Sequence, residues 1–420
     1  MRKIISLLFV LLVSTTLVYA QAHYSEVNQL GGSVNIADVD QTGTGQWSRI
    51  NQNGEGNNAD VNQTDMEHIS KIKQNADFNI ATIDQTGEYN QSQVIQVGNG
   101  GNNADIIQTN HDNYSWARQN GLNNEVDVFQ DGTYADSRIE QIGDVNRAGV
   151  NQHSYMNSSE ILQDGDNNQA DVLQGGFLSG FLTSNIEVFK DDNVQNVNQG
   201  GFLGNNLTSD IYVHGSGNLV DVYQRGAFNY SSVDQGYSAW SNSDFNQAYV
   251  DQFGIGHESY IWQDDDDNTA MVYQNGGYFP GPSGNYSEID QWGDDNNATV
   301  AQLGDFNTSY VNQGESYVQD GDLNSIVVLQ IGGGNWSDAF QYGDNNSADV
   351  TQFGIANYSY LDAEGNHNIA HVYQDGFSHE SYLYQPGNYN TANVTQFGVD
   401  HYSTVFQDGD GDLVNVTQSP

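Results

Sequence analysis

The sequence predicts an all-β fold: a β-solenoid of stacked two-strand units, each of about 22 residues, that form two facing parallel sheets. Three observations support this prediction. Glutamines recur every eleven residues over long stretches, constant residues alternate with variable ones between them, and Gly-Asp-x-Asn sequences separate the segments. Internal repeats of this kind indicate stacking, because one unit alone cannot bury its apolar face.

The glutamine spacing defines the repeat. One run steps by eleven residues from Gln41 to Gln96, and the same step resumes at Gln108 after one extra residue. Ala363 occupies the one position of the C-terminal run where glutamine is missing. The glutamines that we expect to occupy equivalent inward positions are Gln41, Gln52, Gln63, Gln119, Gln141, Gln163, Gln174, Gln291, Gln352, Gln374, Gln396, Gln407 and Gln418.

Two forms of the eleven-residue segment alternate. Residues 346–354 read Asn-Ser-Ala-Asp-Val-Thr-Gln-Phe-Gly, whereas residues 285–293 read Asn-Tyr-Ser-Glu-Ile-Asp-Gln-Trp-Gly. In both forms the constant residues fall at every second position, which is typical of a β-strand with one constant face. The full unit therefore has two strands, and it recurs some seventeen times.

Stacking in register explains why the polar residues repeat along with the apolar ones. Valine and isoleucine fill the interior, and alanine or serine lets the two sheets approach closely. A buried amide is costly unless it forms hydrogen bonds. In a stack, each glutamine or asparagine amide can donate to its equivalent in one neighbouring unit and accept from the other, so a column of like residues satisfies itself.

The regular spacing fails in three places. We expect insertions near residues 175–204, 237–243 and 276–284, with Lys190 and Val213 in two apparent glutamine positions. These insertions are interpreted as loops that leave the solenoid turns. The first one is also compatible with a kink between two rods.

The N-terminus and the composition restrict the class of protein. Residues 1–20 have the positive, apolar and small-residue regions of a signal peptide, so residues 21–420 form the expected mature, exported chain. The sequence has no cysteine, and its formal charge of -44 disfavours nucleic acid and anionic membranes as partners. We expect no membrane insertion, because no later apolar segment approaches the length of a membrane span.

The alternating S-x-I-x-Q-x-G-x-x-N and N-x-A-x-V-x-Q-x-G segments resemble the curlin repeat of bacterial curli fibre subunits. The resemblance implies a secreted functional amyloid that polymerises at the cell surface, with a nucleator subunit, an outer-membrane pore and chaperones as partners. Familiar curli subunits have about five repeats and a Gly-rich segment after the signal peptide; here the repeats are more numerous and begin near Ser25. By position, the resemblance also assigns these residues to the self-assembly ladder: Ser159, Ser287, Asn168, Asn296, Asn346 and Asn390.

Other candidate sites are weaker. His367 and His371 are a conceivable metal pair, but exposed polar residues explain them as well. Asp-rich turns such as residues 264–267 are similar to calcium-binding β-roll turns, yet their aspartates recur irregularly; repulsion between stacked carboxylates, which would slow aggregation, is the simpler interpretation. Outward tyrosines such as Tyr260, together with Tyr310, Tyr360 and Tyr382, suit either an adhesive stripe or ordinary strand propensity.

The sequence therefore predicts a structural protein: the homopolymeric subunit of an extracellular, biofilm-forming fibre, without a cofactor, a bound metal or catalytic residues. The alternative is a monomeric secreted β-solenoid that acts as an adhesin or a calcium-stabilised binding rod. An enzyme on a β-helix scaffold is the weakest hypothesis, since no nucleophile–base pair or phosphate-binding loop recurs in the sequence.

Overall fold

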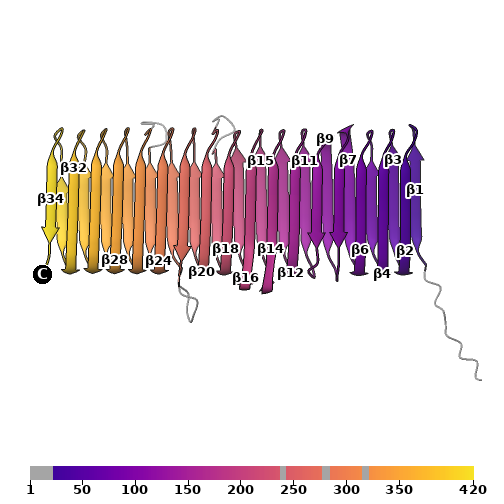
Figure 1. The fold of residues 1–420 in the computed structure, drawn as a ribbon, viewed down its shortest axis with the longest axis horizontal. Coiled ribbons are helices and arrows are strands. Elements are labelled where there is room, and N and C mark those ends of the chain that lie inside the picture. Colours follow the sequence, from indigo (N-terminus) through magenta and orange to yellow (C-terminus); the bar gives the residue numbers. More distant parts are fainter. Residues whose placement is uncertain (1–21, 237–242, 277–283, 315–320) are drawn as a thin grey trace, which may run out of the picture.

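The computed structural model describes residues 22–236, 243–276, 284–314 and 321–420. These residues form 34 β-strands and no helix. Figure 1 shows the strands side by side in one long row, with β1 at one end and β34 beside the C-terminus at the other. The predicted signal peptide, residues 1–20, lies outside the described residues.

The strands belong to two parallel sheets of 17 strands each, which we call the odd sheet and the even sheet after their strand numbers. The odd sheet contains β1 (Tyr24–Leu30), β3 (Trp47–Asn53), β5 (Ile69–Gln74), β7 (Gln91–Gly100), β9 (Tyr114–Leu122), β11 (Asp136–Ile142), β13 (Ser158–Asp164), β15 (Thr183–Phe189), β17 (Thr208–His214), β19 (Tyr230–Gln235), β21 (Glu258–Gln263), β23 (Tyr286–Gln291), β25 (Thr308–Gln313), β27 (Trp336–Gln341), β29 (Tyr358–Ala363), β31 (Glu380–Gln385) and β33 (Tyr402–Phe406). The even sheet contains β2 (Ile36–Thr44), β4 (Asn58–Met66), β6 (Ile80–Glu88), β8 (Asn103–Gln108), β10 (Glu125–Gln130), β12 (Arg147–Tyr155), β14 (Gln169–Gly180), β16 (Val194–Asn205), β18 (Leu219–Ala227), β20 (Gln247–Ile255), β22 (Thr269–Asn275), β24 (Asn297–Asp305), β26 (Ser325–Gly333), β28 (Ser347–Ile355), β30 (Ile369–Phe377), β32 (Thr391–Val399) and β34 (Leu413–Gln418).

The two forms of the segment separate into the two sheets. Strands with serine at the first inward position, such as β23, lie in the odd sheet, whereas strands with alanine there, such as β28, lie in the even sheet. Along each interior strand every second side chain is buried, as the alternation of constant and variable residues predicts.

Each strand pairs in register with its equivalent one turn later. Gln330 lies beside Gln352 and Val328 beside Val350, so like residues form columns along the rod. With 17 strands per sheet and about 4.8 Å between strands, the rod is about 80 Å long. The structure thus confirms the predicted two-sheet β-solenoid of about seventeen turns.

The turns bring the chain from one sheet to the other within a few residues. The residue before most of the turn asparagines adopts a left-handed backbone, for example Asn167 with φ 58° and Asn345 with φ 58°. Glycine and asparagine tolerate this conformation well, which explains the Gly-Asp-x-Asn sequences. Valine is a poor residue for it, yet Val145 has φ 61°, so the stacking outweighs a local preference at that turn.

The irregularity at residues 175–204 does not divide the molecule into two rods. β14 pairs with β16, and β16 with β18, so the even sheet continues through it, and the additional residues extend β14 and β16. The expectation for Lys190 was wrong: Val188 pairs with Gln163 and occupies the glutamine position, whereas Lys190 lies in the following turn. The extra residues separate Gln174 from Gln199 by 25 residues and shift the pattern equally in both sheets.

The other two expected insertions lie mostly outside the described residues, at 237–242 and 277–283. The strands on either side of each gap pair directly, β18 with β20 and β21 with β23. Within the part of the chain that the structure describes, there is no helix with the length and apolar character that crossing a membrane requires.

Candidate functional site

The glutamines of the even sheet form one continuous column from the first turn to the last. Each Nε2 donates a hydrogen bond to the Oε1 of the glutamine one turn later, at 2.8–3.0 Å, from Gln41 through to Gln418. The interior glutamines of this column are at most 1 % exposed. Because the repeat places an equivalent amide on each side, burial leaves no amide of the column without a partner.

Each glutamine also ties the two sheets together. Gln163 of the odd sheet donates from Nε2 to the main-chain oxygen of Arg147 in the even sheet, at 3.0 Å, and Gln174 of the even sheet donates to that of Ser158 in the odd sheet, at 2.9 Å. The amide nitrogen of Gln174 thus serves both Gln199, its neighbour along the rod, and the facing sheet. This double use explains why the glutamine position tolerates few substitutions.

The odd sheet has the same column, but with two breaks. Hydrogen bonds run from Gln29 to Gln163, stop at Val188 and Val213, resume at Gln235, and stop again at Ala363. The glutamine that follows each break, Gln235 or Gln385, has a buried Oε1 without a hydrogen-bond partner. The expected positions of Val213 and Ala363 in the glutamine series are confirmed.

Restoring the column at the second break should stabilise the protein. We expect Ala363→Gln to raise the free energy of unfolding by about 1–2 kcal/mol, because the new Nε2 reaches the orphaned Oε1 of Gln385. Val213→Gln is the matched comparison: it satisfies Gln235, but its own Oε1 meets Val188 and stays unpaired. Chemical denaturation of both variants measures the difference, and equal effects would contradict this account.

The asparagines that precede the even strands form a ladder of a different kind. The main-chain N–H of Asn168 donates to Oδ1 of Asn146 at 3.0 Å, and the Asn168 Nδ2 donates to the main-chain oxygen of Lys190 at 2.7 Å. Sequence reasoning expected amide-to-amide bonds, which only some pairs add, such as Asn193 to Asn168 at 3.2 Å. Because asparagine is one methylene shorter than glutamine, its amide stays beside the turn and binds the main chain. The oxygens of Asn296, Asn346 and Asn390 accept main-chain N–H groups in the same way.

The serines do not take part in a hydrogen-bonded ladder. Ser159 and Ser287 are buried at the expected inward positions, yet their Oγ atoms have no hydrogen-bond partner. The expectation for them is corrected for a physical reason: strands lie about 4.8 Å apart, which a short hydroxyl cannot bridge. Serine instead lies opposite the large glutamine of the facing sheet, as in the 3.3 Å contact from Gln85 to Ser92.

Three buried histidines substitute for asparagine at the turns that precede odd strands. His257 accepts the main-chain N–H of Asn285 through Nδ1 at 3.1 Å, and its Nε2 lies 3.1 Å from the main-chain oxygen of Phe253. These bonds require the neutral ring with its proton on Nε2, and burial lowers the pKa of His257 to about 4. His68 and His379 are placed alike, and burial lowers the pKa of each.

The turns do not form a metal site among the described residues. No group of three or more histidine, aspartate or glutamate side chains there could hold a metal ion. The turn aspartates instead accept main-chain N–H groups of the preceding turn, as Asp166 does from Asp144 at 2.6 Å and Asp294 from Asp266 at 3.0 Å. His367 lies in a turn and stacks on Tyr389, so it does not share a strand face with His371.

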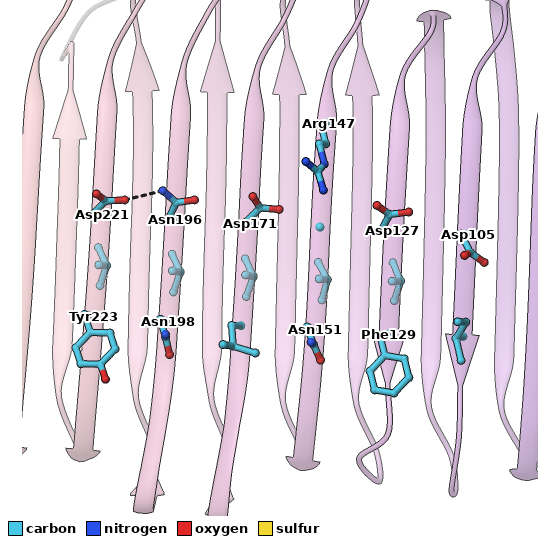
Figure 2. Close-up of a pocket in the computed structure, with 18 residues that line it drawn as sticks. Asp105, Asp127, Phe129, Arg147, Asn151, Asp171, Asn196, Asn198, Asp221 and Tyr223 are labelled. Atoms are coloured by element: carbon cyan, nitrogen blue, oxygen red, sulfur yellow. Dashed lines mark hydrogen bonds between the residues drawn. The ribbon is translucent and has the colours of Figure 1, made fainter.

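The outer face of the even sheet contains a groove of about 660 Å³ between β8 and β18. Figure 2 shows Asp105, Asp127, Asp171, Asn196 and Asp221 in one row on one side of it, with Arg147 beside this row. Burial raises the pKa of Asp105 and of Asp127 in this row. A second, largely apolar row lies across the groove. The first row includes Asp105, Asp127, Asp171 and Asp221, and the second row includes Ile107, Phe129, Leu173 and Tyr223.

The outer face of the odd sheet carries an aromatic zigzag in its C-terminal half. Successive strands contribute Tyr230, Tyr260, Tyr286, Tyr310 and Trp336, whose neighbouring ring centres lie 5.3–5.7 Å apart. Carboxylates lie among these rings and accept hydrogen bonds from tyrosine hydroxyls. The outward tyrosines singled out in the sequence, Tyr260, Tyr310, Tyr360 and Tyr382, all make ring contacts on this face.

The spacing of these columns agrees with a known repeat. Four overlapping segments, at residues 321–354, 343–376, 365–398 and 387–419, match the family model described as the curlin associated repeat. Residues 321–419 of the chain therefore consist of curlin associated repeats. No curated protein matches the chain. The matches begin 22 residues apart, which is one turn of the solenoid, and the glutamine columns of these turns continue with the same hydrogen bonds through the N-terminal turns.

Three features of this rod were missed in the sequence: the bonds from glutamine to the facing sheet, the role of Val188, and the grouping of charges on the outer faces. The 25-residue step between Gln174 and Gln199 was the available signal for Val188, because a shift in one strand requires an equal shift in the next. The bonds between sheets had no sequence signal, since they end on main-chain oxygens.

Proposed function

We propose that this protein is the structural subunit of an extracellular curli-like fibre, in which copies stack end to end and extend both sheets. The support is that the end turns carry the same columns as the interior and are open at their outer edges. The inward Val27 of β1 is 43 % exposed, whereas the equivalent Ile50 one turn later is fully buried. Curlin repeats and a solenoid fold are structural rather than catalytic features.

The polarity of the columns fits the C-terminal turn of one copy to the N-terminal turn of the next. Every glutamine donates toward the C-terminal end, so Gln418 would donate to Gln41 of the incoming copy. The asparagines that precede the even strands accept main-chain N–H groups from the turn that follows, which is the opposite sense. The carboxylate of Asp412 would therefore accept the main-chain N–H of the incoming Asn35, just as Asn390 accepts that of Asp412 at 2.9 Å.

A single charge at the open N-terminal edge tests end-to-end stacking. Val27→Arg places a cation on the inward face of β1, where an incoming turn would bury it, and burying an unpaired charge is strongly unfavourable. Asn28→Arg, on the outward side of the same strand, is the matched control. We expect Val27→Arg to slow seeded fibre growth by about tenfold or more, with Asn28→Arg close to the natural protein.

The natural protein should give fibres that bind amyloid dyes and show a meridional reflection at about 4.7–4.8 Å. A natural protein that stays monomeric at all concentrations would contradict the proposal and favour the monomeric adhesin. Calcium-dependent folding without polymerisation would favour the calcium-stabilised rod instead. Equal growth of the Val27→Arg and Asn28→Arg variants would show that fibres grow by contacts other than the end turns.

The proposed location is outside the cell, on the surface or in a biofilm matrix, with further copies of the chain as the principal partner. A nucleator, an outer-membrane pore and chaperones remain proposed partners by analogy with the family. Of all these proposed partners, a second copy of the chain is the one whose contacts follow from the glutamine and asparagine columns.

A further inference from the structure

We propose that the outer face of the odd sheet is a second self-association surface, by which two rods pack side by side in antiparallel orientation. The basic N-terminal part of the face on one copy contacts the acidic, tyrosine-rich C-terminal part of the same face on the other. This proposal goes beyond end-to-end stacking, because it uses the sides of the rods and leaves their end turns free.

The basic patch lies on strands β3 to β11. It holds five of the ten lysines and arginines of a chain whose formal charge is -44, and the odd-sheet strands β3, β5, β7 and β9 contain no aspartate or glutamate. Two tryptophans support it: Lys71 lies 5.6 Å from the ring centre of Trp47, and Arg138 lies 5.1 Å from that of Trp116. The cations of the patch are Arg49, Lys71, Lys73, Arg118 and Arg138.

The internal ion pairs leave part of this charge unsatisfied. Arg49 binds Glu26 at 3.0 Å and Arg138 binds Glu160 at 3.2 Å, each at the border of the patch, and Arg118 binds Glu140 of β11 within it. Within the described residues, Lys71 and Lys73 form no ion pair, and both side chains are exposed. A concentration of cations on an otherwise acidic rod is complementary to an anionic partner surface.

The acidic tyrosine patch lies on strands β23 to β31, which contain no lysine or arginine. Its tyrosines already orient the carboxylates: Tyr358 donates to Asp338 at 3.0 Å and Tyr286 to Glu288 at 2.6 Å. The ring contacts hold these side chains in place, so little side-chain entropy is lost on docking. The carboxylates of the patch are Glu288, Asp290, Asp338, Asp362 and Glu380.

The order of the strands makes the two patches reciprocal. In a sheet of 17 strands, antiparallel alignment of two copies places β5 of one opposite β29 of the other, and β11 opposite β23. Lys71 and Lys73 then face Asp362, with Asp338 one strand away. A two-fold axis repeats the same contact at the other end, so both patches of both copies are used at once.

The size of this contact is sufficient for a specific interface. Five strands at about 4.8 Å, each with three outward residues about 6.7 Å apart, give a patch of roughly 450 Å². Four such patches bury roughly 1,800 Å² in total, within the range of stable protein interfaces. Between them, β13 to β19 carry carboxylates around a hollow of about 380 Å³, which keeps the like charges of the two copies apart.

The overall negative charge does not prevent this contact at physiological salt. The Debye length there is about 8 Å, so charges on the distant even sheets, at least two sheet spacings away, are largely screened. The facing charges of the two patches lie within a few ångströms and decide the energy. Raising the salt concentration should therefore weaken the side-by-side dimer.

A charge exchange in the background of Val27→Arg tests the proposal, since we expect that variant to stack slowly through its N-terminal edge. We expect the background protein to form a dimer in sedimentation velocity. Lys71→Glu with Lys73→Glu should weaken the dimer about tenfold or more, and mixing it with Asp338→Lys plus Asp362→Lys should restore full-strength dimers. Arg147→Glu with Arg225→Glu, on the even sheet, is the control and should leave dimerisation unchanged.

Three results would overturn the proposal: a background protein that is monomeric up to about millimolar concentration, a mixture that does not recover, or a monomer whose basic patch binds a sulfated polysaccharide without dimerising. Fibre growth by the natural protein reports on end-to-end stacking separately. A fibre-forming protein without the lateral dimer would reject this inference and leave the proposed function standing.

Discussion

Gln141→Ala should lower the free energy of unfolding by about 2–5 kcal/mol, although it removes only a small polar group. Gln141 accepts from Gln119 at 3.1 Å, donates to Gln163 at 2.9 Å and donates to the main-chain oxygen of Glu125 at 3.0 Å. All three partners are left without their bond. The interior offers them no water, so each pays much of its desolvation cost.

The matched control is Gln93→Ala, which removes the same side chain from the outer face of β7. We expect a change within about 0.5 kcal/mol there, as for other surface substitutions. Denaturant unfolding of the Val27→Arg background keeps polymerisation out of the measurement. If both alanine variants lose the same stability, the glutamine column does not contribute to the folded state in the way described.

The natural chain already lacks the glutamine at three positions of the odd column. Val188, Val213 and Ala363 interrupt the odd column, and the breaks coincide with the unpaired oxygens of Gln235 and Gln385. The even column has no interruption among its described strands. We infer that the solenoid tolerates a break when the other sheet is continuous, so a second break at the same turn should cost more than the sum of two separate ones.

The fold was predictable because the repeat imposes one period on everything inside it. Eleven-residue spacing and alternation were sufficient to define the strands, the two sheets and the inward glutamines. Asparagine and serine were misjudged for a common reason: the pattern gives the position of a side chain but not its reach. Asn168 is long enough to bind the main chain of the turn, whereas Ser159 reaches no neighbour.

The outer faces were much less predictable, because their residues vary from turn to turn. The prediction of outward tyrosines needed only the alternation within a strand. The grouping of Lys71 with Arg138, several turns apart in sequence, depends on knowing that alternate segments belong to the same sheet. The groove on the even sheet depends on the same knowledge, since its lining residues come from six strands, β8 to β18, that alternate in sequence with strands of the odd sheet.

The pH dependence of stability should come from two opposing sets of buried groups. Burial raises the pKa of Asp234 and of Asp290 from 3.8 to about 6, so each carboxyl favours the unfolded state above about pH 6. As the pH falls from about 6 to 4, protonation in the folded state recovers up to about 1–3 kcal/mol per group, allowing for solvent screening.

His257 acts in the opposite direction. Its pKa is about 4 in the folded protein against 6.5 ordinarily, so its stabilising contribution is complete above about pH 6.5 and falls as the pH decreases toward 4. The loss amounts to about 2 kcal/mol at about pH 5. The carboxyls gain a similar amount over the same interval, so the natural protein should change little in stability between about pH 7 and 5.

Two substitutions should separate these contributions. His257→Asn introduces the residue that most turns already use at this position, where its Oδ1 can accept the N–H of Asn285; we expect this variant to become about 2 kcal/mol more stable at about pH 5 than at pH 7. Asp290→Asn should have the opposite effect, because it removes one carboxyl whose protonation stabilises the fold at low pH. We expect this variant to be about 1 kcal/mol less stable at about pH 5 than at pH 7. Both expectations are tested by measuring the unfolding free energy of each variant between about pH 5 and pH 7 in the Val27→Arg background. If the unfolding free energies of the two variants depend on pH in the same way, neither His257 nor Asp290 has the shifted pKa described above.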